Sequence, residues 1–221
     1  MVVLEQPNSS ERHRDNTLFG GPLKRVQDAL IAVLVLIIMA PLMLVIAAAV
    51  KLQDDGPALF RQVRVGRYGA PFAMLKFRSM VPDATGRLKR LLEEDPEAAR
   101  EWGEKQKLAN DPRVTPLGRL LRSTSLDELP QFLNVLLGHM SVVGPRPILP
   151  EQVNAYGAGF SLYCTARPGI TGLWQVAGRS DTTFQRRSEF DQTYLRTWSA
   201  ITDITLILRT FSVVIGRRGA C

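Results

Sequence analysis

The chain has 221 residues, of which 45% are apolar, and a formal charge of +7 from 28 Lys and Arg against 21 Asp and Glu. This length holds one compact domain with an anchor, or at most two small domains. Two cysteines are too few for a disulfide framework, and no Cys/His cluster predicts a structural zinc. The basic balance suggests an anionic partner: nucleic acid, lipid headgroups or a phosphorylated substrate.

The composition divides the chain into four parts. Residues 1–22 are polar and predict a flexible tail. We expect a membrane helix over 23–52, a folded domain over 53–215 and a short tail over 216–221. The prediction of a membrane helix is based on an uncharged apolar run over 29–50. At about 1.5 Å per residue, a helix of this length can cross a hydrocarbon core of about 30 Å. A signal peptide is the alternative, but its apolar region is usually only about 7–15 residues long.

Pro41 lies near the middle of this apolar run. Proline removes a backbone donor and therefore kinks or breaks a helix. Two geometries remain: a kinked spanning helix, or a re-entrant helix–break–helix that enters and leaves on one face. Lys24 and Arg25 precede the run and Lys51 follows it, so both flanks are basic. Because basic flanks favour the cytoplasmic side, the sequence favours the re-entrant geometry.

The rest of the chain predicts an α+β fold that is mainly helical with a small β element. Alternating apolar residues with Gly and Pro punctuation predict a hairpin over 57–80. Residues 83–109 predict two helices divided at Pro96. We expect loop and short strand over 164–181, and helices over 117–122, 127–137, 183–195 and 201–215. The last helix has an apolar stripe, which fits either an interfacial helix on anionic lipid or a helix that faces the core.

Asp127 and Glu128 are the first candidates for chemistry. Ser125 and Glu128 fit a capping box, but Pro130 would then fall inside the helix and lose a hydrogen bond. A cap at Asp127 avoids that loss. In both registers the two carboxylates lie at a helix N-terminus, whose partial positive charge favours their ionised form. An ionised Asp can attack phosphorus or bind Mg²⁺, while capping alone is the simpler interpretation.

Basic residues surround this acidic pair in the sequence. Pro145 and Pro147 restrict the backbone around Arg146, which suits a guanidinium that grips a phosphate. Trp174 and Arg179 are candidates for contact with a base or sugar, although Trp174 fits a core position as well. The other basic candidates are Lys76, Arg78, Arg113, Arg119 and Arg122.

Several sequence blocks occur in an order that matches a known family. The blocks are Leu75-Lys76-Phe77-Arg78-Ser79-Met80, Asn110-Asp111-Pro112-Arg113, Ser125 to Gln131, Met140 to Pro147, Arg167 to Gly172 and Trp174-Gln175-Val176. With them the chain resembles the bacterial monotopic phosphoglycosyl transferases, which start exopolysaccharide, capsule and O-antigen synthesis. The resemblance runs from about Lys24 to Ile215. Within this family the chain is most similar to the short rhizobial-type enzymes that transfer galactose phosphate in succinoglycan synthesis.

The resemblance implies a reaction. Such an enzyme transfers hexose 1-phosphate, with galactose or glucose as the sugar, from a UDP-sugar to undecaprenyl phosphate and releases UMP. Asp127 would be the nucleophile that forms an aspartyl-phosphosugar intermediate, and Glu128 would help hold Mg²⁺ and support proton transfer. Asp127 and Glu128 would together be the Mg²⁺ ligands. Phosphates or nucleotide would be bound by Arg146, Lys76, Arg78, Arg122, Pro145 and Pro147.

The resemblance also implies a place in the cell. The catalytic domain would lie on the cytoplasmic face of the inner membrane, with the re-entrant helix in the bilayer. The family usually breaks this helix at Ser-Pro, whereas this chain has Ala40-Pro41 and lacks the hydroxyl that could satisfy a freed carbonyl.

Other interpretations of the chain stay open. A ternary-complex transferase would use the acidic pair only as Mg²⁺ ligands and base, and a basic membrane adaptor would need no such pair. We expect no nucleic-acid partner, because the basic residues are scattered without a recognition motif. Homo-oligomerisation is left open.

Overall fold

The computed structural model describes residues 21–105, 108, 110–177 and 183–215. The predicted tails lie outside this range, except for residues 21 and 22, and so does Arg179. Within the described residues the fold is mainly helical, with two small two-stranded sheets. The predicted α+β class is therefore confirmed.

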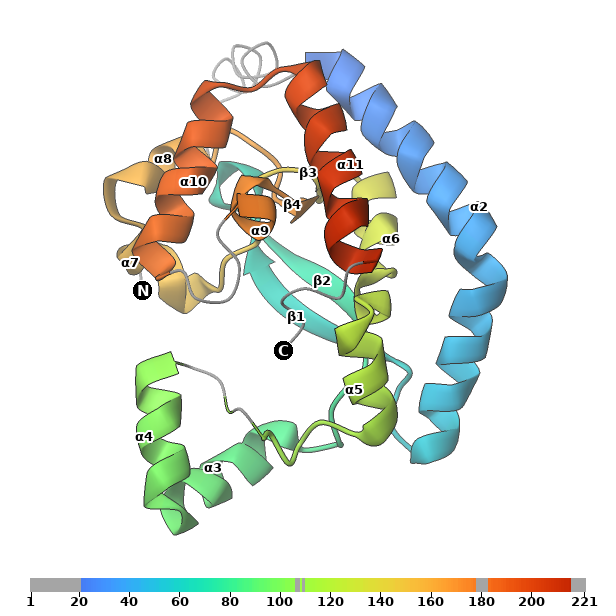
Figure 1. Cartoon of the computed structure of the whole chain (residues 1–221), viewed down its shortest axis with the longest axis vertical. Coiled ribbons are helices and arrows are strands. Elements are labelled where there is room, and N and C mark those ends of the chain that lie inside the picture. The colour runs from blue at the N-terminus through green and yellow to red at the C-terminus, as the bar shows by residue number, and fades with distance from the viewer. Residues whose placement is uncertain (1–20, 106–107, 109, 178–182, 216–221) are drawn as a thin grey trace.

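The predicted membrane helix forms α2 (Gly21–Gln53). It runs through Pro41 without interruption and curves along one side of the molecule (Figure 1). The expected separation into two helices is not seen, because the loss of one backbone donor at proline can be absorbed as a bend in a continuous helix. The helix is long and apolar enough to cross a membrane.

Both ends of α2 pack against the same domain. Near its start, Lys24 forms a buried ion pair of 2.5 Å with Asp203. Near its end, Val50 packs in a buried cluster with Phe77 and Leu121. Between these anchors the helix exposes large apolar side chains, which are Leu30, Val33, Leu34, Ile37, Ile38, Leu42, Leu44 and Val45.

The predicted hairpin and the helix pair that follows it are confirmed. Strand β1 (Leu59–Val65) pairs antiparallel with β2 (Pro71–Phe77), with Phe60 opposite Lys76. Helices α3 (Ala84–Glu94) and α4 (Pro96–Lys105) meet at Pro96 and extend away from the other helices (Figure 1).

The next elements build the acidic turn and the layer behind it. Helix α5 (Pro116–Ser123) is capped by Thr115, whose side chain accepts from the Gly118 amide. A 3₁₀ turn, η2 (Leu126–Glu128), precedes α6 (Gln131–Leu136), against which α2 packs. Strands β3 (Ser141–Val143) and β4 (Gly169–Thr171) pair in parallel.

Short helices and two longer ones complete the domain. The short ones are η3 (Pro150–Gln152), α7 (Val153–Tyr156), η4 (Gly157–Gly159), α8 (Phe160–Tyr163) and α9 (Leu173–Ala177). Helices α10 (Phe184–Arg196) and α11 (Ala200–Ile215) follow close to the predicted bounds. The main core lies between β2, α6, β3 and α10, and contains Met74, Val135, Met140, Val143 and Tyr194.

Helix α11 packs only part of its apolar surface against the core. Its buried side carries Leu206 and the charged Asp203, whereas Ile201, Ile204 and Leu208 are exposed. The interpretation of this apolar stripe as core-facing is therefore wrong for these three residues. The buried charge is tolerated because Asp203 is bonded by Lys24, Tyr194 and Trp198.

Candidate active site

The acidic pair lies in the η2 turn between α5 and α6. Ser125 adopts a left-handed conformation with φ of 56° and makes no side-chain capping bond, so the capping box that Pro130 argues against is not formed. Asp127 is not the cap of the following helix either, because Pro130 occupies that position. The turn satisfies its own backbone through bonds from the amides of Glu128 and Leu129 to the carbonyls three residues earlier.

Lys76 of strand β2 lies beside both carboxylates. Its Nζ is 2.6 Å from Glu128 Oε1 and 3.9 Å from Asp127 Oδ2. Asp127 is only 7% exposed, while the Glu128 side chain keeps 36% of its surface. The hairpin therefore places Lys76 beside the acidic pair.

The environments of the two carboxylates differ. Burial raises the pKa of Asp127 to about 6, and Glu128 adds to this rise while Lys76 and Arg122 oppose it. This corrects the expectation that a helix terminus would dominate its ionisation. Burial also acts to raise the pKa of Glu128, but Lys76 and Arg146 outweigh it and lower that pKa. A pair with separated pKa values is typical of sites that assign different roles to two acids.

Arg146 lies in the loop after β3, close enough to Glu128 for its charge to lower the pKa of that carboxyl group. Its backbone amide donates to Asp191 Oδ2 of α10 at 3.2 Å. Its guanidinium lies 4.8 Å from the centroid of the Trp174 ring. Burial lowers the pKa of Arg146, and the charges of Glu128 and Asp191 act in the opposite direction. An arginine remains charged at neutral pH, so this loop presents a cation to the acidic pair.

The two prolines beside Arg146 help to fix the backbone of the loop that carries it. Both are buried, and the Pro147 carbonyl accepts a bond of 3.1 Å from Arg64 of β1. The Pro145 carbonyl accepts from the Gly169 amide at 2.8 Å. A Cβ on Gly169 would lie 2.1 Å from the Gly144 amide nitrogen, so the close approach of these two segments requires glycine.

Two further basic candidates, Arg122 and Arg78, lie in different places. Arg122 donates to Ser79 Oγ at 2.9 Å and lowers the pKa of Asp127, so it belongs to the surroundings of the acidic pair. Arg78 instead forms an ion pair of 2.5 Å with Asp54 and contacts the Val50 carbonyl. The contacts of Arg78 therefore fasten the end of α2, and they do not include either carboxylate of the pair.

Other side chains of the site are missed by the sequence interpretation. Arg64 is not among the predicted site residues, yet burial lowers its pKa to about 10, and the charges of Arg146 and Glu128 also influence that pKa. Asp191 and Arg187 are not considered at all. Their signal would have been the four-residue spacing that places both on one face of α10.

The donor set allows a magnesium ion. Within the described residues, no group of three or more His, Cys, Asp and Glu side chains could hold a metal. Mg²⁺ is commonly bound by one or two carboxylates together with water and substrate phosphates, and Asp127 with Glu128 can supply that protein share.

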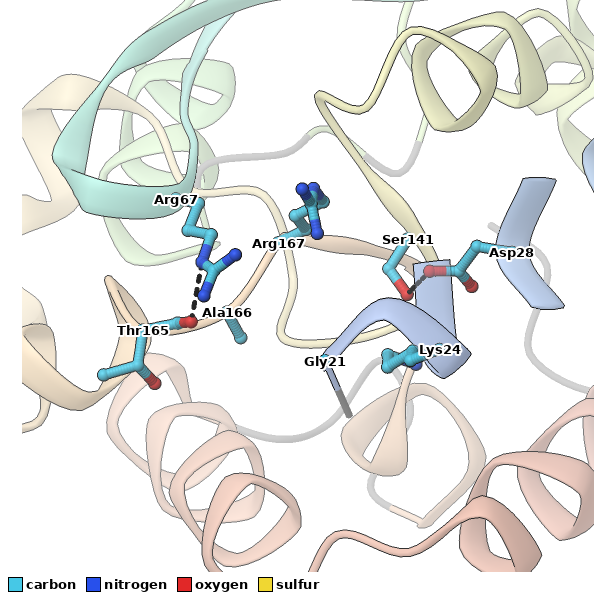
Figure 2. A pocket seen from close by; sticks show the side chains of 8 residues that line it. All are labelled: Gly21, Lys24, Asp28, Arg67, Ser141, Thr165, Ala166 and Arg167. Atoms are coloured by element: carbon cyan, nitrogen blue, oxygen red, sulfur yellow. Dashed lines mark hydrogen bonds between the residues drawn. The ribbon is translucent and has the colours of Figure 1, made fainter. Parts of the chain in front are cut away.

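A small cavity lies elsewhere, at the start of α2. It is lined by Gly21, Lys24, Asp28, Arg67, Ser141, Thr165, Ala166 and Arg167 (Figure 2). Within it Asp28 accepts from Ser141, and Arg67 donates to the Thr165 carbonyl. None of the predicted site residues lines this cavity, so it is separate from the acidic pair.

Comparison with known proteins gives consistent matches. Residues 19–217 match the family model described as bacterial sugar transferase. The chain is 47% identical over 198 residues to the undecaprenyl-phosphate galactose phosphotransferase of Salmonella typhimurium, covering 90% of this chain and 41% of that protein. It is 42% identical over 201 residues to the exopolysaccharide production protein ExoY of Rhizobium meliloti, covering 91% and 89% respectively.

A third relative transfers glucose 1-phosphate by its name. It is the UDP-glucose:undecaprenyl-phosphate glucose-1-phosphate transferase of Escherichia coli, 43% identical over 196 residues, which are 85% of this chain and 39% of that protein. The chain thus spans about two fifths of the length of several of these relatives and most of the length of ExoY. The family match covers nearly the whole chain, and the chain belongs to the bacterial sugar transferase family.

Proposed function

We propose that the chain transfers hexose 1-phosphate, with galactose or glucose as the sugar, from a UDP-sugar to undecaprenyl phosphate and releases UMP. The observation that carries this proposal is the buried Asp127 beside Lys76 and Glu128, together with the charge of Arg146, which lowers the pKa of Glu128. The names of the relatives from Salmonella typhimurium and Escherichia coli agree with it. In the cell, this reaction would be the first membrane step of exopolysaccharide synthesis.

The proposed reaction has two displacements at phosphorus. In the first, a carboxylate oxygen of Asp127 attacks the phosphorus that carries the sugar, and the bond from that phosphorus to the bridging oxygen breaks, so UMP leaves with the electron pair. In the second, a phosphate oxygen of undecaprenyl phosphate attacks the same phosphorus, and the Asp127 carboxylate leaves. Covalent catalysis replaces one hard step by two easier ones. With a pKa of about 6, Asp127 is mostly ionised at neutral pH.

The surrounding cations would stabilise the charge on the transferring phosphoryl group. Arg146, Lys76 and Arg122 are the groups we assign to this role. Glu128, with Asp127 and substrate phosphates, would hold Mg²⁺, which neutralises phosphate charge when bound. Arg64 supports the Arg146 loop through its bond to the Pro147 carbonyl.

We also propose that α2 enters and leaves the membrane on one face. A straight helix of 33 residues would be about 50 Å long, yet both of its ends pack against one polar domain. A spanning orientation would separate these ends by a bilayer, whereas a re-entrant one leaves both contacts intact. The basic flanks of the helix favour an orientation in which the domain lies on the cytoplasmic face of the inner membrane.

The ternary-complex alternative has one observation in its favour. A carboxylate with a pKa of about 6 is also a competent general base at neutral pH. In that mechanism Asp127 would remove a proton and never become phosphorylated. Exchange of labelled UMP into UDP-sugar without any lipid acceptor separates the two, since only the covalent route permits it.

The activity itself is tested by UMP release from purified protein. The assay contains undecaprenyl phosphate, Mg²⁺ and a panel of UDP-sugars. We expect release with UDP-galactose or UDP-glucose. Absence of release with every sugar of the panel, from folded protein in detergent or lipid discs, would contradict the proposal.

A further inference from the structure

Two guanidinium groups lie against one indole ring, and one of them belongs to Arg146, whose charge lowers the pKa of Glu128. The Arg146 and Arg187 Cζ atoms are each 4.8 Å from the centroid of the Trp174 ring. Trp174 is buried in α9, which packs against α10, the helix that carries Arg187. Contact with an aromatic ring holds a guanidinium in a defined plane. The Trp174 ring therefore contacts both cationic side chains.

This arrangement brings like charges together. Burial lowers the pKa of Arg187, and the charge of Arg146 lowers it further. Arg187 has no hydrogen-bonding or carboxylate partner among the described residues, and its Nε is buried without an acceptor there. The adjacent Arg186 differs, since it forms an ion pair of 2.6 Å with Glu189. Repulsion between two such cations is relieved when an anion binds both.

Helix α10 connects this pair to the reacting groups. Asp191 and Arg187 lie one turn apart on its surface, so the helix that receives the Arg146 backbone amide also presents Arg187 to the Arg146 side chain. Arg146 in turn influences the pKa of Glu128 in the acidic pair. One 13-residue helix thus places Arg187 next to the site where phosphate chemistry is proposed.

We propose that Arg187 and Arg146, held on Trp174, form a two-guanidinium site for phosphate oxygens. Guanidinium groups bind phosphate through paired hydrogen bonds, and two of them suit a diphosphate with one group for each phosphorus. The diphosphate of the sugar nucleotide is the ligand expected, a choice that rests on the proposed function. The phosphate of the lipid acceptor offers the same chemistry, and the experiment separates the two.

Binding of UDP and of inorganic pyrophosphate to the purified full chain tests this site by calorimetry. We expect Arg187→Ala to weaken both by at least about 10-fold, as loss of a charged hydrogen bond predicts. The matched control Arg186→Ala removes the same charge one residue away and should stay within about twofold of the wild type. Arg187→Lys keeps the charge but loses the planar contact, so it should bind with intermediate affinity and shows that weak binding is not a folding defect.

Steady-state kinetics then show whether the two guanidinium groups bind the donor diphosphate or the phosphate of the lipid acceptor. A rise in KM for the UDP-sugar alone supports the donor diphosphate. A rise confined to undecaprenyl phosphate supports the same site with the acceptor as ligand. Wild-type UDP binding and both KM values unchanged in Arg187→Ala would overturn the proposal. Wild-type protein that binds UDP through Arg187 but releases no UMP from any sugar would overturn the proposed function and leave the site standing.

Discussion

Lys76 donates a hydrogen bond of 2.6 Å to Glu128, while the same nitrogen stays 3.9 Å from Asp127. The ammonium group is therefore bound mainly by the carboxylate with the lowered pKa. The charge of Lys76 lowers the pKa of Asp127, but Lys76 makes no direct hydrogen bond to Asp127. The carboxylate oxygen atoms of Asp127 are therefore not occupied by Lys76 and are available to a substrate. This division explains how adjacent acids in one turn can take different roles.

Replacing Lys76 should shift the pH dependence of the reaction. Lys76 lowers the pKa of Asp127, so Lys76→Met should raise that pKa above its present value of about 6. Because the nucleophile must be ionised, the acidic limb of UMP release moves to higher pH and activity at pH 6.5 falls. Lys89→Met, on the exposed surface of α3, serves as control. An unchanged acidic limb in Lys76→Met would contradict the assigned electrostatic role.

Asp191 should make stability depend on pH. Burial raises its pKa to about 7, although Tyr156 and Arg146 act to lower it. Since the unfolded value is about 3.9, the folded state binds the proton more tightly, and the stability from this group is present below about pH 4 and lost as pH rises to about 7. Asp191→Asn stays neutral, so its stability relative to wild type should increase between pH 5 and pH 7, by at most about 1.4 kcal/mol per unit.

Thermal unfolding in detergent at pH 5 and pH 7 measures this difference. Glu189→Gln changes an exposed acid on the same helix and should show no such trend. A difference between Asp191→Asn and wild type that is the same at both pH values would show that Asp191 is ionised in the folded protein throughout.

The buried ion pair between Lys24 and Asp203 should hold the start of α2 in place. Lys24→Met leaves the buried carboxylate with only Tyr194 and Trp198 as partners, so we expect a loss of about 3–5 kcal/mol. Adding Asp203→Asn removes the stranded charge and should recover part of the loss. Lys51→Met, at the exposed end of the helix, should cost under about 1 kcal/mol. Equal effects of the two lysine variants in denaturant unfolding would contradict this anchor.

The topology of α2 can be tested at its two exposed ends. Leu23 is 74% and Leu52 86% exposed, so cysteines at these positions should react with an impermeant maleimide. In a background with Cys164 and Cys221 replaced by serine, both cysteines should be labelled in inverted vesicles and neither in intact cells. Labelling of the two positions from opposite faces would rule out the re-entrant arrangement.

The elements predicted well are those with a strong local pattern. The hairpin is predicted by its alternating apolar residues. The boundary between α3 and α4 is predicted by Pro96, and the extent of α2 is predicted by its apolar run. Strands β3 and β4 have three residues each and pair across 28 positions, so their pairing has no local signal. Pro130 indicates that a cap at Ser125 is unfavourable, but it does not predict the structure that forms instead. That structure is a 3₁₀ turn whose amides bond to its own backbone carbonyls.

The candidate site shows the same limit. Lys76 and Arg146 were expected near the acidic pair because both stand in motifs that carry the family resemblance, and the fold brings them there. Asp191 reaches the Arg146 amide across 45 positions, a contact set by the packing of α10. Arg78 was expected beside the phosphates but its nearest acid is Asp54, which no spacing in the sequence indicates.

The covalent role of Asp127 is tested most directly by intact-mass measurement after incubation with UDP-galactose or UDP-glucose and Mg²⁺, without lipid acceptor. We expect the wild-type chain to gain one hexose phosphate and to release an equivalent amount of UMP, and Asp127→Asn to do neither. UMP release by Asp127→Asn near the wild-type rate, or a wild-type chain that turns over with acceptor yet never carries the adduct, would contradict the nucleophilic role.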